Sequence, residues 1–317
     1  MSYPAQAGHP AFTESEDELG TRGILDRPPA PVPAQSGADD DAEREVITVP
    51  LDDSGFLDIG TQHLEYRMIG PRPDEAPTIV MLHEGLGCAG LGGDFPDKLQ
   101  QATGAGIFVY SRAGYGQSSP VQLPRPLSYM HDEAGDTLPQ LLDAIGFKRG
   151  LLLGHGDGAS IAAIYTGSHQ DHRVGGLVLI APHFFTEDSS IESIMRVRTA
   201  YETGNLRAQL LRWHKDVDNA FHGWADPWLD PEFRQWDITE FLAYIRVPVL
   251  IVQGEDDLDN TAKQIAAAER ECYCPMEVAL LKGARHSPQH QVPEAALKAI
   301  SEFVDRVLEA NEWAVAA

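Results

Sequence analysis

The chain has 317 residues, of which 43% are hydrophobic, and its 24 Lys and Arg residues against 48 Asp and Glu residues give a formal net charge of −24. This charge argues against nucleic acids and anionic membrane surfaces as partners. Three cysteines are too few for a disulfide framework, no apolar run is long enough to span a bilayer, and residues 1–10 lack a signal-peptide pattern. We therefore expect a cytoplasmic protein, and composition leaves homo-oligomerisation open.

The first 45 residues differ in composition from the rest of the chain. They are rich in proline and in acidic residues and poor in large apolar ones. Such a segment cannot bury enough surface to offset its conformational entropy. We predict a disordered acidic tail over residues 1–45, and nothing in it identifies a partner.

Short β-like runs alternate with helical patterns from Val46 onward. Alternating or continuous apolar runs predict half-exposed strands at 46–49 and 63–68 and buried strands at 78–82, 107–110, 151–153, 177–180, 249–252 and 278–281. Helical patterns cover 130–145, 261–270 and 294–308. Buried strands that alternate with helices are typical of an α/β protein, so we predict a mostly parallel central sheet with helices on both faces.

Residues 183–245 interrupt this alternation, because they contain no convincing buried strand and are rich in tryptophan and phenylalanine. We predict a helical cap here, inserted between a first part of the core (46–182) and a second part (246–317). Aromatic side chains of such a cap would favour a small-molecule substrate with an apolar portion.

The strand at 151–153 runs into Gly154-His155-Gly156-Asp157-Gly158 and then into a helical stretch. This strand–turn–helix context is typical of a nucleophile elbow, G-x-S-x-G, whose small flanking residues allow a very tight turn. Gly156 occupies the nucleophile position, so the turn is present without the nucleophile.

An acid and a base follow the last two predicted strands, in the order expected after an elbow. Asp257 comes after the strand at 249–252, and His286 comes after the strand at 278–281. A carboxylate that accepts the His Nδ1–H fixes the ring tautomer, so that the other nitrogen can take a proton. Asp256 is an alternative to Asp257 as the acid.

Two glycine-rich turns, at 83–87 and 111–118, follow the strands at 78–82 and 107–110. Backbone N–H groups of the first turn, together with the N–H of Asp157, are suited to stabilising a developing oxyanion.

From Val46 to the C-terminus, these motifs in this order resemble the α/β-hydrolase superfamily. The chain looks most like its capped bacterial branch of enol-lactonases and meta-cleavage-product C–C hydrolases. The resemblance implies a cofactor-independent hydrolase for a small acyl ester, a lactone or a β-dicarbonyl C–C bond. It also implies that Asp257 and His286 are the triad acid and base and that Leu86 and Asp157 are the oxyanion donors. Gly156 stands where the family has serine.

Three other residues could replace the missing nucleophile. For Asp157 to be the nucleophile, the elbow motif would have to start one residue later, which puts His155 where the motif needs a small residue. Ser160 lies about one helical turn, ~6 Å, beyond the elbow, and we expect it on the helix surface. Cys88 lies near the first glycine-rich turn, where a small buried cysteine is the commoner role.

Three functional hypotheses follow. The first is a serine-type hydrolase in which Gly156 is an inactivating change, and the second is a non-covalent enzyme that uses His286 and Asp257 as a general-base dyad. The third is a degenerate hydrolase that only binds a ligand or partner, although such a protein needs neither the dyad nor the oxyanion turn. No metal or organic cofactor is expected, because no ligand cluster or phosphate-binding motif occurs in the sequence.

Overall fold

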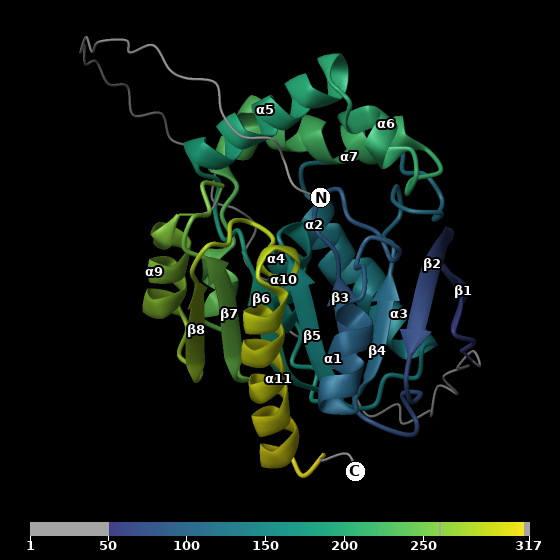
Figure 1. The fold of residues 1–317 in the computed structure, drawn as a ribbon, viewed down its shortest axis with the longest axis vertical. Coiled ribbons are helices and arrows are strands. Elements are labelled where there is room, and N and C mark those ends of the chain that lie inside the picture. Colours follow the sequence, from purple (N-terminus) through teal and green to yellow (C-terminus); the bar gives the residue numbers. More distant parts are fainter. Residues whose placement is uncertain (1–50, 260, 314–317) are drawn as a thin grey trace, which may run out of the picture. The chain divides into compact units, whose positions relative to one another are not determined.

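One mixed sheet organises the part of the chain that the computed structural model describes, residues 51–259 and 261–313 (Figure 1). Its strands are β1 (Ser54–Ile59), β2 (Gln62–Ile69), β3 (Thr78–Leu82), β4 (Gly106–Tyr110), β5 (Gly150–His155), β6 (Val174–Ile180), β7 (Val249–Gly254) and β8 (Met276–Leu281). They lie in the order β1-β2-β4-β3-β5-β6-β7-β8. β2 is antiparallel to both β1 and β4, and all later neighbours are parallel.

The mostly parallel α/β architecture predicted from the sequence is confirmed, with two differences in the strands. β1 is not among the predicted strands, because only Leu57 and Ile59 of its residues are buried. β8 is a half-exposed edge strand rather than the buried strand predicted at 278–281, because it has a neighbour on one side only. The predicted tail over residues 1–45 and the predicted strand at 46–49 lie outside the described residues.

Successive residues of the central strands point to opposite faces of the sheet and pack into two hydrophobic cores, one on each face. Val80 and Leu82 pack with α3 (Leu138–Ala144) and α4 (Asp157–Ser168), whereas Ile79 packs with α1 (Phe95–Thr103) and α11 (Pro293–Ala310). Figure 1 shows α1 and α11 together on the near face of the sheet. This coverage of both faces explains why the central strands read as continuous apolar runs.

The helix predicted over 130–145 is interrupted. It consists of α2 (Tyr129–Asp132), a π-helical turn (Glu133–Thr137) and α3. Pro139 lies in the first turn of α3 and has no N–H to donate, which favours a local departure from the α-helical bonding pattern. The helices α9 (Ala262–Glu271) and α11 agree with the predictions at 261–270 and 294–308, and a short α10 (Pro288–Gln291) precedes α11.

The segment between β6 and β7 is helical, as predicted for residues 183–245. It contains α5 (Asp188–Thr203), α6 (Leu206–Leu210), α7 (Val217–Leu229), a 3₁₀ turn (Pro231–Gln235) and α8 (Thr239–Leu242). In Figure 1, α5, α6 and α7 lie beyond the edge at which the parallel strands end. The role of this segment as a cap, and the domain boundaries given above, stay predictions. Within the described residues, no helix is both long and apolar enough to cross a membrane.

Candidate active site

The turn between β5 and α4 is sharp, and Gly156 is at its apex. Gly156 has φ 52° and ψ −118°, a conformation that is unfavourable for a residue with a Cβ. Its N–H donates to the carbonyl of Ile180 (3.0 Å), and its carbonyl accepts the N–H groups of Ala159 and Ser160. The turn is therefore fixed from both sides at the carboxyl edge of the sheet.

The glycines on either side of the apex are required by close packing. A Cβ on Gly158 would lie 2.1 Å from the carbonyl oxygen of Leu82, and a Cβ on Gly154 would lie 2.3 Å from the carbonyl oxygen of Gly158. Both neighbours are backbone atoms, which cannot rotate away. No side chain fits at either position without moving β3, β5 or α4.

Replacing Gly158 with alanine is therefore expected to lower the free energy of unfolding by about 2–3 kcal/mol. Urea unfolding followed by circular dichroism measures this loss. The matched control is Gly135→Ala, because a Cβ there would meet no atom within 4 Å. If both variants unfold at the same urea concentration as the wild type, the packing argument for the turn is wrong.

His286 faces residue 156 from the loop that follows β8. A Cβ on residue 156 would lie 3.3 Å from Nε2 of His286. The other ring nitrogen, Nδ1, lies 3.2 Å from Oδ2 of Asp257, which follows β7. With Nδ1–H donated to this carboxylate, Nε2 is the ring atom directed at residue 156.

The carboxylate of Asp257 is buried and held by two further donors. Oδ2 accepts from Nε2 of Gln253 (2.7 Å), and Oδ1 accepts from the backbone N–H of Asp259 (2.9 Å). Burial alone would raise the pKa of this carboxyl, but the hydrogen bond and charge of His286 outweigh it and hold the pKa below its usual value. Asp256 is exposed, and none of its described contacts reaches His286. The structure thus brings Asp257, not Asp256, to His286.

The charge of His286 is set by its acidic neighbours. Burial disfavours the imidazolium, but the hydrogen bond and charge of Asp257, with smaller contributions from Asp259 and Glu84, raise the pKa of His286 to about 9. His286 is therefore positively charged at neutral pH and loses its proton as the pH rises through about 9.

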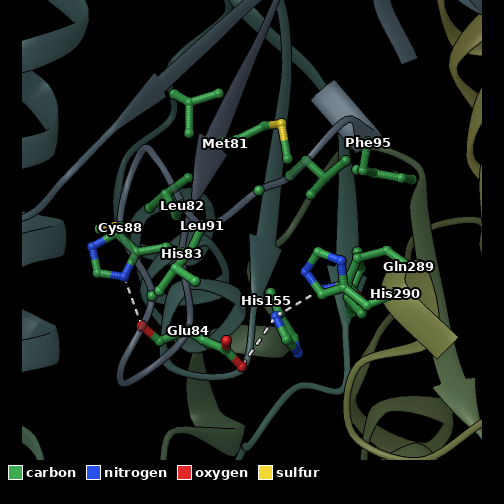
Figure 2. A pocket seen from close by; sticks show the side chains of 15 residues that line it. Met81, Leu82, His83, Glu84, Cys88, Leu91, Phe95, His155, Gln289 and His290 are labelled. Atoms are coloured by element: carbon green, nitrogen blue, oxygen red, sulfur yellow. Dashed lines mark hydrogen bonds and ion pairs between the residues drawn. The ribbon is translucent and has the colours of Figure 1, made fainter. Parts of the chain in front are cut away.

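Glu84 lies beside the same space, on the turn that follows β3. Its Cβ would be 3.5 Å from a Cβ on residue 156. One carboxylate oxygen lies 3.5 Å from Nδ1 of His155, and Figure 2 shows the Glu84 side chain directed toward that ring. Glu84 lies in the glycine-rich turn at 83–87, which the sequence singles out for its backbone N–H groups and not for this carboxylate.

The side chain of Asp157 is directed away from His286. The buried carboxylate accepts from the hydroxyl of Tyr129 (2.5 Å) and from Nε1 of Trp228 (3.3 Å). Burial together with the Asp157 charge raises the pKa of Tyr129 well above its usual value, so the phenol remains a donor. The structure gives no support to Asp157 as an alternative nucleophile.

Neither of the other two alternative nucleophiles is placed for attack. Ser160 was predicted on the helix surface, and this is wrong: it is fully buried because α4 is enclosed on almost every side, and its Oγ donates to the carbonyl of His183 (2.6 Å). Cys88 is buried as well, and burial raises the pKa of its thiol to about 11. A thiol with such a pKa is a weak nucleophile at neutral pH.

The turn after β3 is tied to the helical segment between β6 and β7. Nε2 of His214 donates to the carbonyl of Leu86 (3.1 Å), and Nδ1 accepts the N–H of Gly116 (3.0 Å). Burial lowers the pKa of His214, which favours the neutral ring that this pair of bonds requires. No described contact joins Leu86 to residue 156, so the oxyanion roles of Leu86 and Asp157 stay predictions.

Two sets of described residues offer ligand atoms close enough together for a metal ion: Glu84, His155 and His286, and Asp257, Asp259 and His286. In the first set, Nε2–H of His155 donates to the carbonyl of His286 (2.7 Å), and Nδ1 accepts from Gln289 (3.0 Å). In the second set, Asp257 and His286 are bonded to each other. The first set would need a ring nitrogen of His155 that is already hydrogen-bonded, and the second would need to break the Asp257–His286 bond, so neither set fits a metal ion well.

A family model described as "Alpha/beta hydrolase family" matches residues 79–299. The proline iminopeptidase of Lactobacillus helveticus (strain DPC 4571) is 24% identical over 279 residues, which cover 76% of this chain and 94% of that protein. Among solved structures, the proline iminopeptidase of Mycobacterium smegmatis has a TM-score of 0.63 at 15% identity, over 81% of this chain and 99% of that one. The enol-lactonase from Burkholderia xenovorans LB400 has a TM-score of 0.61 at 17% identity, over 78% of this chain and 99% of that one. Both structures share the fold of this chain.

Proposed function

The chain belongs to the alpha/beta hydrolase family, and we propose that it hydrolyses a small acyl ester or lactone at residue 156, with the pair Asp257–His286 transferring the proton. One observation carries this proposal. Nε2 of His286 is 3.3 Å from the position of a Cβ on residue 156, while Nδ1 is 3.2 Å from the carboxylate of Asp257. This is the arrangement of a proton-transferring histidine, oriented by a carboxylate, at the nucleophile position of an elbow.

Glycine at position 156 cannot form a covalent acyl-enzyme, so in this proposal a water molecule attacks the substrate carbonyl directly. Positioned acid–base groups accelerate such a step by about 10²–10⁴-fold without a protein nucleophile. The hypothesis of a degenerate hydrolase that only binds a ligand leaves the buried Asp257–His286 pair without a purpose, and we set it aside for this reason.

The substrate class rests on the surroundings of the turn after β3. The indole of Trp224 lies against Gly85, and the ring of Trp213 lies against Gly90. Both tryptophans come from the helical segment between β6 and β7, which we propose to be a cap over the substrate. Aromatic walls favour an ester or lactone with an apolar portion, and the likeness to an enol-lactonase agrees with this class.

The purified protein should therefore hydrolyse a small lactone or an alkyl ester such as ethyl butyrate, whose leaving alkoxide must take up a proton, at least about 10²-fold faster than a His286→Ala variant. An N-terminal prolyl anilide and a β-diketone, assayed beside them, separate peptidase and C–C hydrolase activities from the proposed one. Equal rates for the wild type and His286→Ala on every ester and lactone would show that the proposed function is wrong.

A further inference from the structure

Two titratable side chains, those of His286 and Glu84, border the space at residue 156. A Cβ there would lie 3.3 Å from Nε2 of His286, 3.5 Å from the Cβ of Glu84 and 3.8 Å from its Cα. One carboxylate oxygen of Glu84, one ring nitrogen of His155 and one of His286 all lie within 4.8 Å of one another. An oxygen atom in this space therefore has both an imidazole and a carboxylate within reach.

The contact between Glu84 and His155 leaves the carboxylate free to accept a proton. A carbonyl can only accept, so the 2.7 Å contact of Nε2 with the carbonyl of His286 places the ring hydrogen of His155 on Nε2. Nδ1 then accepts from Gln289, and burial lowers the pKa of His155, which favours this neutral ring. The 3.5 Å approach of Glu84 to Nδ1 is thus not a hydrogen bond, and His155 does not occupy the lone pairs of the carboxylate.

We propose that Glu84 is a catalytic residue, the general base that takes a proton from the attacking water, and that His286 is the general acid. This inference rests on the proposed function. The water oxygen bonds to the acyl carbon while one of its protons passes to the carboxylate of Glu84. The bond from the acyl carbon to the alkoxy oxygen then breaks, and the leaving oxygen takes the proton on Nε2 of His286. Transfer of the proton from Glu84 back to His286, through solvent, restores both groups and leaves an acid and an alcohol.

The electrostatics of the site agree with this division of roles. A pKa of about 9 keeps His286 protonated at neutral pH, so it is ready to act as an acid and not as a base. The other charged or titratable groups around His286 are Asp257 and Asp259, both after β7, and His155 and His183. Those around Glu84 are His155, His290, Cys88 and Arg112, whose Nη2 donates to the Glu84 carbonyl. The two aspartates favour the protonated form of His286.

A cavity of about 60 Å³ borders Glu84 and His155 and provides room for water near the carboxylate. Its other polar lining residues are His83, Gln289 and His290, and most of the remaining lining is apolar (Figure 2). A partly polar cavity of this size is large enough to hold water. Gly156 and His286 are not among its lining residues, so the cavity reaches Glu84 from the side away from residue 156.

The test is Glu84→Gln, which keeps the shape of the side chain and removes the base. We expect kcat for 4-nitrophenyl acetate to fall by about 10²-fold or more with little change in KM, and Glu84→Asp to recover part of the loss. With a lactone or an alkyl ester, whose alkoxide must be protonated as it leaves, wild-type activity should fall as the pH rises through about 9. The residual activity of Glu84→Gln on 4-nitrophenyl acetate should rise with pH, because hydroxide replaces the lost base. The matched control is Glu269→Gln, an exposed residue on α9 that should leave kcat unchanged.

Testing Glu84→Gln a second time, in a Gly156→Ser protein, shows whether Glu84 acts as a base or only supports the structure. In Gly156→Ser the serine attacks and His286 takes its proton, so Glu84→Gln should then change kcat less than about fivefold. Three results would each overturn the role of Glu84. The first is an equal loss of kcat from Glu84→Gln in both backgrounds, and the second is a loss below about threefold in the wild-type background. The third is activity that a metal chelator removes and Zn²⁺ restores. If the wild type is no faster than His286→Ala, the proposed function fails and this inference fails with it. If His286 is required and Glu84 is not, only this inference fails.

Discussion

Replacing Gly156 with serine is expected to raise the turnover of 4-nitrophenyl acetate by about 10³-fold or more, because it supplies the one group that the site lacks for covalent catalysis. A Cβ on residue 156 would lie 3.3 Å from Nε2 of His286, so the serine Oγ would be within hydrogen-bonding reach of the base. The rate of the variant should rise with pH through about 9, since His286 must lose its proton before it can accept one from serine. An organophosphonate should label residue 156 in this variant.

The matched control for this variant is Gly156→Ala. Both variants place a Cβ on a residue with φ 52°, and both should lose about 1–3 kcal/mol of stability for that reason. Only serine adds the hydroxyl, so alanine should give no label and no gain in rate. A folded serine variant with neither label nor gain would show that residue 156 is not a nucleophile position, and it would remove the basis for assigning a hydrolytic site to this turn.

The second large effect is expected from Asp257→Asn. Loss of the charge should lower kcat at pH 7.5 by about 10²–10⁴-fold, because Asp257 both orients His286 and stabilises its protonated form. The pKa of His286 should fall from about 9 to below its ordinary value, because burial lowers it and the Asp257 charge no longer raises it. The falling limb of the pH–rate profile should move with it. Two-dimensional NMR of the ring protons measures the same pKa without any substrate.

Asp256→Asn serves as the control for this variant, because Asp256 is the exposed neighbour of Asp257 and has no described contact with His286. It should change neither kcat nor the pKa of His286. If Asp256→Asn has the larger effect, the acid of the site is Asp256 and the geometry around Asp257 is not the functional one.

The sequence was sufficient to predict the central sheet, because strands buried on both faces must be apolar throughout and such runs are easily recognised. It also predicted the turn at Gly156, since the flanking glycines have little room for any other residue. Asp257 and His286 could be singled out because the carboxyl ends of parallel strands meet at one edge, where residues far apart in the sequence come together. The structure places those two side chains in contact.

Features set by tertiary packing were beyond the sequence. Ser160 looks like a surface residue in a helix of small side chains, but α4 is enclosed on almost every side. β8 has the composition of a buried strand and lies at the edge. The turn at 83–87 draws attention to its backbone N–H groups and not to the Glu84 side chain. The role of this side chain can be inferred only from its distance to residue 156 and from the bonds that engage both nitrogens of its neighbour His155.

The most direct test of the proposed chemistry is the pre-steady-state release of 4-nitrophenolate from 4-nitrophenyl acetate, followed by stopped-flow absorbance. We expect the wild type to release product linearly from the first turnover, because glycine at position 156 cannot hold an acyl group. Gly156→Ser should instead show a burst of about one equivalent per protein molecule, as expected when an acyl-enzyme accumulates. A burst from the wild type would reveal a covalent nucleophile elsewhere in the chain and would contradict water attack at Gly156.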